Sequence, residues 1–541
     1  MARTKPQEIW NEFEEIKSYM TSQNLYSTVE TNEKFYEGKQ WEGLSENSTM
    51  PKPVFNVLQR AGKFMVATIG SNDIAITMTP FTEVADEIER IVPISKEIEN
   101  IIEIARIKEQ SKIIIRNAFV DGAGYLLLSF DPSVKTGQPV KGIVKSQIID
   151  NTNMYFGNPY SNDVQSQPYI IVALRQHISQ VRKEAKRLGI SKEDIEQIKP
   201  DNQTDQVNDD SSKLVTVLLK FYKEYKKEDN VKQEIDKYTG EINEIHDVRE
   251  YETVWFTKTT CNVTLIKPTD LGYRRYPISC FGWDLIKNSF LYTSPMTANI
   301  MNQIFINKSF AIAQMYGLQS AFPKIIFDKS KVDMDDFLNS TSPYAVSGID
   351  MMGKFLDFIK IPDFSNNIIE LGKETISQTK DCMGVTDASL GNVNPDNTSA
   401  IIALQESSNV PLEIQKQGFF EFWEDTVRNI IDIIANNYGV RQIMTEDNKL
   451  ATVDFSILKD INFNLKVEIG TGAQFSEIAQ VNTLDKLVQA GFIPPDAYMK
   501  AVPSKYIPQK QSLLNAYYQM VSQGQVPESR GSTELDENAP L

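Results

Sequence analysis

The residues that could perform chemistry in this sequence are few, and their spacing does not suit it. The three cysteines, Cys261, Cys280 and Cys382, contain no C-x-x-C pair, and His177 and His246 are the only two histidines. An odd set of scattered cysteines argues against a disulfide framework and so against a secreted protein. Two histidines cannot build a multi-histidine metal site. We expect structural or exposed histidines, a buried Cys382 that behaves as a small apolar residue, and no bound metal.

The glycine and aspartate motifs also lack the spacing of a phosphate or calcium site. Gly122 and Gly124 come nearest to a dinucleotide fingerprint, but a third glycine is missing. The pair also follows a predicted helix and opens a strand, which is the wrong order, so a tight helix-to-strand turn is favoured. No Gly-Lys pair is followed by Ser or Thr, and the aspartates within 333–336 have no glycine or later glutamate to complete a calcium loop. We therefore predict no catalytic residue and no cofactor, and a structural or assembly protein rather than an enzyme.

The composition bounds the class of protein further. The chain has 541 residues, with 56 Lys and Arg against 72 Asp and Glu, which gives a formal charge of −16. This length exceeds one ordinary core, so two or more domains, or one with large insertions, are expected. The acidic balance excludes the uniformly basic surface of a nucleic-acid coat. No apolar run suits a signal peptide or a membrane span, so we expect a soluble product that is made in the cytoplasm.

The apolar periodicity predicts an α+β protein that is mainly helical. Helices are expected at 5–20, 56–69, 82–118, 178–199, 295–319, 364–382 and 398–438, and strands at 74–79, 125–130, 140–149, 322–327, 344–349 and 463–469. Ser294 and Pro295 suit the cap and first turn of the helix at 295–319. Pro93 should kink or split the helix at 82–118, and Pro411 should kink the longest helix, at 398–438. Strand-like runs with dense charge of both signs at 213–283 indicate a small α/β subdomain with a solvated surface.

Four groups of short motifs follow one another in a fixed order over roughly residues 30–440. They are Phe35-Tyr36-Glu37-Gly38-Lys39-Gln40-Trp41 with Pro53 and Asn56; Asp121-Gly122-Ala123-Gly124-Tyr125 with Asn153-Met154-Tyr155-Phe156-Gly157-Asn158-Pro159; Tyr276-Pro277-Ile278 with Gln303 and Asn307-Lys308; and Met383-Gly384-Val385 with Leu390-Gly391. Taken together, this order resembles that of the portal proteins of tailed double-stranded-DNA phages.

The resemblance implies a portal-like protomer with wing, stem, clip and crown that assembles into a ring. It places the amino-terminal wing at 1–170, a charged helix and flexible linker at 171–212, the clip at 213–283 and the stem helix at 284–324. The carboxy-terminal wing would follow at 325–397 with a tunnel loop at 385–397, then a kinked long helix at 398–440, the crown at 441–523 and a disordered tail at 524–541.

The resemblance also implies a function without covalent chemistry. The ring would sit at one capsid vertex, nucleate head assembly, dock the terminase, serve as the channel for double-stranded DNA packaging and ejection, and attach the tail. Implied partners are further copies of the chain, twelve in the virion, the major capsid and scaffold proteins, the terminase large subunit, head-completion or tail adaptor proteins, and DNA without sequence specificity. No cofactor, metal or membrane is implied, and the protein would pass through the host cytoplasm during assembly.

The implied tunnel loop has a composition that suits sliding DNA. Twelve copies of the chain would carry a formal charge of about −190, which repels phosphate. The loop contains no Lys or Arg, and its aspartates and asparagines are our candidates for lining the channel: Asp387, Asn392, Asn394, Asp396 and Asn397. Its asparagines could make weak, sequence-blind contacts with phosphate. An ordinary surface loop that caps the next helix is the alternative.

In the implied clip, four basic residues alternate with acids and are our candidates for partner binding. They are Lys223, Lys226, Lys227 and Arg249. Mixed charge of this kind suits a hydrated, partner-selecting rim, and it equally suits any exposed hairpin.

Two other functions also stay open from the sequence. One is a different virion structural protein, such as a scaffold or tail-hub component, and the other is a cytosolic hydrolase with a diffuse acidic site.

Overall fold

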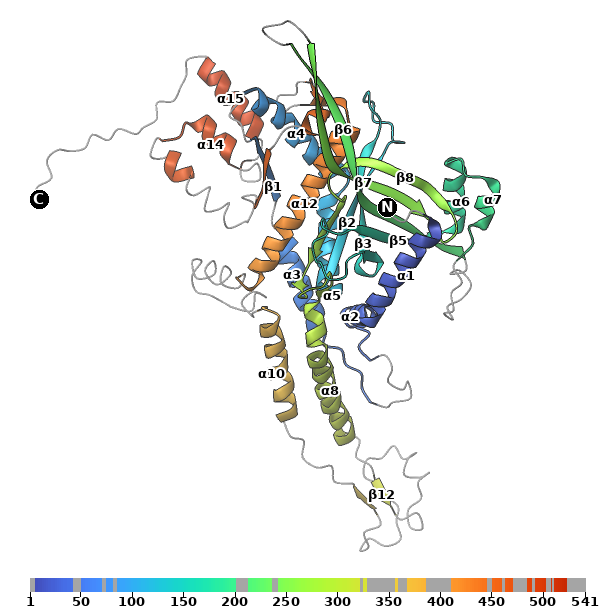
Figure 1. Cartoon of the computed structure of the whole chain (residues 1–541). Helices are drawn as coiled ribbons and strands as arrows, with labels where there is room; N and C mark the ends of the chain where they lie inside the picture. The colour runs from blue at the N-terminus through green and yellow to red at the C-terminus, as the bar shows by residue number, and fades with distance from the viewer. Residues whose placement is uncertain are drawn as a thin grey trace, which may run out of the picture.

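The computed structural model of the chain describes residues 5–41, 50–70, 74–80, 85–200, 213–235, 242–321, 325–327, 356–358, 367–385, 410–444, 450–459, 463–469, 484–488, 492–502, 507 and 510–522. Within these ranges helices and strands follow one another in separate runs along the chain, such as α1 to α3 and β6 to β11, and pack together in one body (Figure 1). The protein is therefore an α+β protein, as the apolar periodicity predicts.

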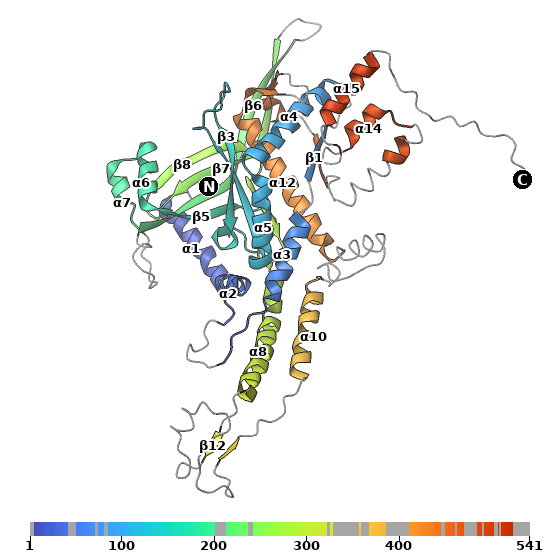
Figure 2. The same cartoon turned by 180° about the vertical axis from the view of Figure 1, so that it is seen from behind.

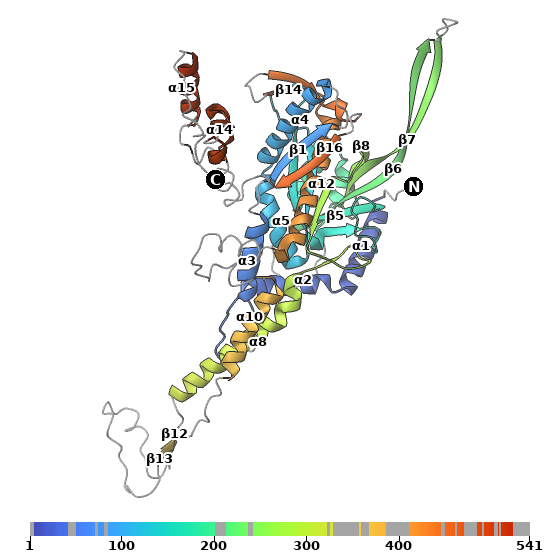
Figure 3. The same ribbon diagram turned by 90° about the vertical axis from the view of Figure 1, so that its left-hand side faces the viewer.

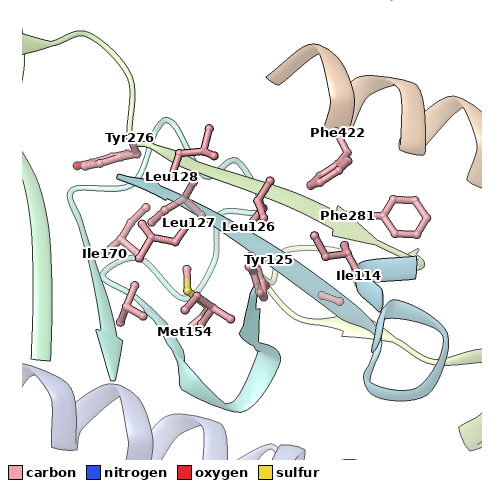
Figure 4. Close-up of a cluster of buried hydrophobic side chains, with 14 of the residues drawn as sticks. Ile114, Tyr125, Leu126, Leu127, Leu128, Met154, Ile170, Tyr276, Phe281 and Phe422 are labelled. Atoms are coloured by element: carbon pink, nitrogen blue, oxygen red, sulfur yellow. The ribbon is translucent and has the colours of Figure 1, made fainter. Parts of the chain in front are cut away.

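A three-stranded antiparallel sheet, ordered β3-β2-β9, lies in the middle of the body. Its strands are β2 (Ala123–Asp131), β3 (Ile143–Asp150) and β9 (Ile278–Gly282). The first six residues of β2 are buried, because the strand lies between two partners and apolar side chains cover both of its faces. Met154 and Ile170 lie on one side of it and Phe422 on the other (Figure 4).

The glycine pair before β2 forms a tight turn from helix to strand, which confirms the structural reading of that motif. Helix α5 (Ile107–Asp121) ends at Gly122, whose φ of +94° is strained for any residue with a side chain. A Cβ atom there would also lie 2.4 Å from the backbone oxygen of Tyr292. The glycine is needed for this turn and not for a phosphate.

A five-stranded antiparallel sheet, ordered β4-β5-β6-β7-β8, forms a second layer that helix α1 (Pro6–Ser22) covers. Its strands are β4 (Met154–Phe156), β5 (Tyr169–His177), β6 (Leu214–Ile235), β7 (Ile242–Thr259) and β8 (Thr264–Tyr273). Strands β6 and β7 are far longer than their neighbours, and their outer halves leave the sheet as a two-stranded ribbon (Figure 3).

Residues 213–283 do not form the separate small subdomain that the sequence predicted, because their strands pair with strands from the rest of the body. Strand β6 pairs with β5 over nine residues, from Tyr169 opposite Tyr222 to His177 opposite Leu214. Strand β9 pairs with β2 of the central sheet. The segment at 171–212, expected to be a charged helix and linker, accordingly begins as a sheet strand. Helices α6 (Ile178–Arg187) and α7 (Lys192–Gln197) then replace the single expected helix.

Further helices complete the body: α2 follows α1 and lies beside it, and the others pack around the central sheet (Figure 2). They are α2 (Leu25–Glu37), α3 (Val57–Gly70), α4 (Ala85–Ile104), α5 and α12 (Glu413–Asn437). Helix α12 buries an aromatic run in which Phe419 packs edge-on against Phe281 of β9, with ring centroids 5.7 Å apart. That contact fixes α12 across the central sheet.

Short antiparallel pairs, 3₁₀ turns and two late helices also lie within the described residues. The pairs are β1 (Ile74–Pro80) with β16 (Phe463–Ile469), β10 (Asp284–Leu285) with β11 (Tyr292–Thr293), and β14 (Val440–Met444) with β15 (Leu450–Asp454). The 3₁₀ turns are η1 (Asn151–Asn153), η3 (Val410–Leu412) and η4 (Phe455–Lys459), and two late helices are α14 (Pro495–Ala501) and α15 (Lys510–Ser522).

Pro93 does not split the helix expected at 82–118, and the break comes later. Helix α4 passes through Pro93, and the chain turns at Arg106, whose φ is +54°. The carbonyl oxygen of Ala105 that this turn frees accepts a 2.9 Å hydrogen bond from the Ser146 hydroxyl of β3. Because that partner is 41 residues away, local sequence could not predict the position of the break.

Two helices leave the body side by side at the end opposite the β6–β7 ribbon. They are α8 (Pro295–Ala321) and α10 (Asn367–Cys382), and they run antiparallel in all three views (Figures 1–3). At their far end, strands β12 (Ile325–Phe327) and β13 (Leu356–Phe358) pair antiparallel. Helix α8 begins at Pro295, as predicted. Cys382, the last residue of α10, is exposed, so the expectation that it is buried is wrong.

Candidate functional site

The first turn of α8 is fixed to the end of α5 and to the middle of α2. The Ser294 hydroxyl accepts a hydrogen bond from the Met296 amide at 3.0 Å and donates one to the Phe119 carbonyl of α5 at 2.6 Å. It therefore caps α8, as predicted, and also anchors it. The Asn32 amide of α2 donates to the Val120 carbonyl and to the Thr297 hydroxyl, at 2.8 and 2.9 Å. The start of α8 is thus held by α2 and α5 together.

Two turns further along, a buried amide network ties α8 to the segment at 50–57. Gln303 donates to the Phe55 carbonyl at 2.7 Å and accepts from the Val57 amide at 3.0 Å. Asn307 accepts from the Phe55 amide at 3.2 Å and donates to the Gln40 side chain at 2.6 Å. Gln303 also donates to Asn307 at 3.0 Å. The backbone of an extended segment is therefore satisfied by one face of a helix.

The same segment is held from its other side by the aromatic motif at 35–41. The Asn56 side chain donates to the carbonyls of Phe35 and Tyr36, at 3.1 and 3.0 Å. The Trp41 indole donates to the Pro53 carbonyl at 2.9 Å. Motifs that lie about 250 residues apart in the sequence thus meet at the root of α8 and form one network, which sequence reasoning did not foresee.

This root network consists of neutral amides. A buried, fully paired amide network is insensitive to pH and poorly screened by salt, and breaking one member leaves polar groups without partners. Gln303 and Asn307 are 0% and 2% exposed, so water cannot replace a lost partner. The network therefore sets the direction in which α8 leaves the body and holds it under varied ionic conditions.

A charged cluster lies close by, around Arg116 of α5. Arg116 pairs with Glu33 of α2, and its guanidinium lies 4.9 Å from the centre of the Tyr36 ring. Burial, together with the negative charge of Glu33, raises the pKa of Asp121 to about 7, and the positive charge of Arg116 opposes this shift. One Asp121 oxygen is buried and has no hydrogen-bond partner, so the neutral carboxyl suits this place. Burial also raises the pKa of Asp150.

A hollow of about 430 Å³ opens beside this cluster, between α3 and α5. It is lined by the polar or charged residues Tyr36, Lys63, Lys112 and Arg116 and by small apolar residues of α3. Within the described ranges no group of three or more acidic, histidine or cysteine residues could hold a metal ion. The same ranges contain no helix with the length and apolar character needed to cross a bilayer.

Comparison with protein families assigns the chain to a family. The family model of phage P22-like portal proteins matches residues 15–539. The chain belongs to this family. No curated protein matches it. The family is one of structural phage proteins, so the protein has a portal role in the phage particle, and the alternatives of a hydrolase, a scaffold protein or a tail-hub component fall away.

The structure reaches only the first residue of the tunnel loop predicted for this portal protein. Val385 is buried and follows the end of α10. Asp387, Asn392, Asn394, Asp396 and Asn397 all lie outside the described residues, so their contact with DNA stays a prediction.

Pro411 lies in the 3₁₀ turn η3, directly before α12 begins at Glu413. The described part of the long helix expected at 398–438 is therefore α12 alone. Residues 398–409 lie outside the described ranges, so the kink at Pro411 stays a prediction. Pro411 also packs close to the turn after α10, because a Cβ on Gly384 would lie 2.9 Å from the proline Cβ.

The four basic candidates of the predicted clip lie on β6 and β7, and their environments differ. Lys223 is held in the body, where its ammonium donates to the Gln165 carbonyl at 2.6 Å and lies 4.9 Å from the Tyr276 ring. Desolvation lowers its pKa.

The other three candidates lie further along the ribbon. Lys226 and Lys227 are exposed and pair with Asp270 and Glu250. Arg249 lies opposite Glu228 in the β6–β7 register, and its side chain is outside the described residues. Partner binding by the four stays a prediction.

Sequence reasoning missed a buried ion pair that joins α1 to the five-stranded sheet. Lys220 of β6 donates to Glu12 of α1 at 2.5 Å, and their side chains are 1% and 8% exposed. The lysine ammonium also lies 4.7 Å from the Tyr169 ring. A lysine inside the apolar run at 214–222 was the available signal, because a buried cation needs a partner.

Proposed function

We propose that copies of this portal protein close into a ring, twelve-fold in the virion, at one capsid vertex. The ring nucleates head assembly, docks the terminase large subunit, passes double-stranded DNA during packaging and ejection, and attaches the tail through adaptor proteins. The observation that carries this proposal is the α8–α10 pair, which leaves the body as a projection held rigidly at its root.

Helix α8 has the composition of a helix that is covered by other protein. Lys308 is its only charged residue between Pro295 and Ala321, in a chain that is otherwise rich in charge. A helix that is apolar or uncharged on every side is normally buried, yet in a single chain much of α8 is bare. Neighbouring copies around a ring would supply the missing cover.

The direction of this pair also revises the domain assignment that we propose. If α8 is the stem, the described residues at its far end, away from the body, are those of the β12–β13 pair. Residues 213–283 instead supply three strands of a sheet in the body. We therefore place the clip at 322–366 and count 213–283 with the wing. The crown at 441–523, the tunnel loop at 385–397 and the tail at 524–541 keep their proposed places.

Negative-stain electron microscopy of the purified protein tests the proposed ring. We expect annular particles with a central hole and, along the side view, a narrow projection from one face. A protein that remains a compact monomer at every concentration would refute ring formation. A host-cell packaging assay then separates a ring that passes DNA from one that is only structural.

A further inference from the structure

Helix α8 exposes a stripe of apolar residues with one cation in the middle. Met301, Phe305 and Ile312 are 73%, 38% and 44% exposed, and Lys308 is exposed between them. The spacing i, i+4, i+7 and i+11 places all four on one face of a helix. That face lies away from Gln303 and Asn307, which bind the body. Lys308 forms no ion pair with the described residues.

Helix α10 exposes an acidic stripe with the same spacing. Glu370, Glu374, Ser377 and Asp381 are exposed at i, i+4, i+7 and i+11. Gly372, one of the buried residues on the opposite face of α10, packs against α8. The acidic stripe therefore faces away from the α8 of its own chain.

The contact between α8 and α10 within one chain sets the height of one stripe relative to the other along the helix axes. Gly372 packs against Ser309, where an added Cβ would lie 3.3 Å from the serine Cβ. Because the helices are antiparallel, one step back along α8 from Ser309 corresponds to one step forward along α10 from Gly372. Along the helix axis, Lys308 therefore lies at the height of Lys373 and Glu374, to within about the 1.5 Å rise of one residue.

In a ring, the stripes of neighbouring copies keep the same relative height. Copies in a closed ring are related by rotation, which preserves height along the axis. If the helix pair runs along that axis, the α10 of the next copy presents its acidic stripe at the height of the α8 stripe. Glu374 then faces Lys308, Ser377 faces Phe305, and the ends of the stripes coincide.

We propose that the α8 stripe of one copy docks on the α10 stripe of the next, with Lys308 paired to Glu374 of the neighbouring copy. The aliphatic parts of Glu370 and Glu374, with the 55% exposed Leu371, cover the apolar residues of α8. This inference rests on the proposed ring. A second copy is the occupant that the structure favours, because one chain carries both stripes and they match in spacing and complement each other in charge.

Charge reversal tests the pairing. Lys308→Glu or Glu374→Lys places like charges opposite each other at every interface, which disfavours association. We expect each to raise the protein concentration needed for rings at least about tenfold, as measured by mass photometry, and the double exchange to restore most of the loss. Lys373→Glu, on the same helix but off the stripe, is the matched control and should assemble as the native protein does.

Cysteine cross-linking gives a readout that does not depend on stability. In a Cys382→Ser background, oxidised Lys308→Cys/Glu374→Cys protein should form a ladder of covalent oligomers on a non-reducing gel, and neither single cysteine should. Native rings with no ladder and no effect of charge reversal would overturn this interface and leave the portal ring standing. Absence of rings in the native protein would overturn both.

Discussion

The buried ion pair between Lys220 and Glu12 should control how firmly α1 is docked on the five-stranded sheet. Lys220→Met leaves the Glu12 carboxylate in a place where it is 8% exposed and has lost its cation. Removing one partner of a buried pair costs about 3–5 kcal/mol. Since about 1.4 kcal/mol is a factor of ten, amide exchange in α1 should speed up by roughly two to nearly four powers of ten.

Hydrogen exchange with mass spectrometry is the suitable assay, because it follows α1 locally in a large protein that need not unfold in one step. The matched control is Lys226→Met on the same strand. Lys226 also pairs with an acid, Asp270 at 3.0 Å, but its side chain is 51% exposed. An exposed pair contributes about 0–1 kcal/mol, so α1 exchange should hardly change.

The double variant Lys220→Met/Glu12→Leu completes the test. Replacing both members of a buried pair by apolar residues is often neutral or stabilising, so exchange in α1 should return close to the native rate. If Lys220→Met left α1 exchange unchanged, or if the double variant lost as much as the two single variants together, the pair would not be what docks this helix.

Three further variants test other parts of the fold. Gln303→Ala removes a buried amide from the root network and should cost about 1–3 kcal/mol, seen as a lower thermal midpoint, and an unchanged midpoint would contradict the network's role. Asp121→Asn should stabilise the protein at pH 8. The native carboxyl, whose pKa is raised to about 7, favours the folded state when it is protonated, and this stability is lost as the pH rises through 7. The stability that the variant gains over the native protein should therefore be smaller at pH 5 than at pH 8. Gly122→Ala should abolish soluble protein, because an added Cβ meets backbone at 2.4 Å, whereas Gly137→Ala, where φ is +74° and the space is open, should cost only about 1 kcal/mol.

Local signals in the sequence predicted the elements whose ends are set locally. Helix α8 begins where Ser294 and Pro295 indicated, because a cap and a first-turn proline act within a few residues. The turn at Gly122 was readable for the same reason. These elements include the helix that the proposed ring depends on.

Features set by distant partners could not be predicted from the sequence. The break at Arg106 is stabilised by Ser146, and the strand that precedes α6 exists because β6 pairs with it across a gap of dozens of residues. The root network is a third case: its motif residues were recognisable one by one, but nothing local indicates that Gln303 and Gln40 belong to the same network. Long-range pairing, and not weak propensity, limited the sequence analysis.

The position of α8 in the assembled particle tests the central claim most directly. A cryo-electron microscopy map of the purified oligomer would locate α8 and α10 relative to the symmetry axis. We predict that the α8–α10 pairs stand side by side around a central channel wide enough for duplex DNA. A map in which these helices lie on the outer rim, away from any channel, would contradict the account.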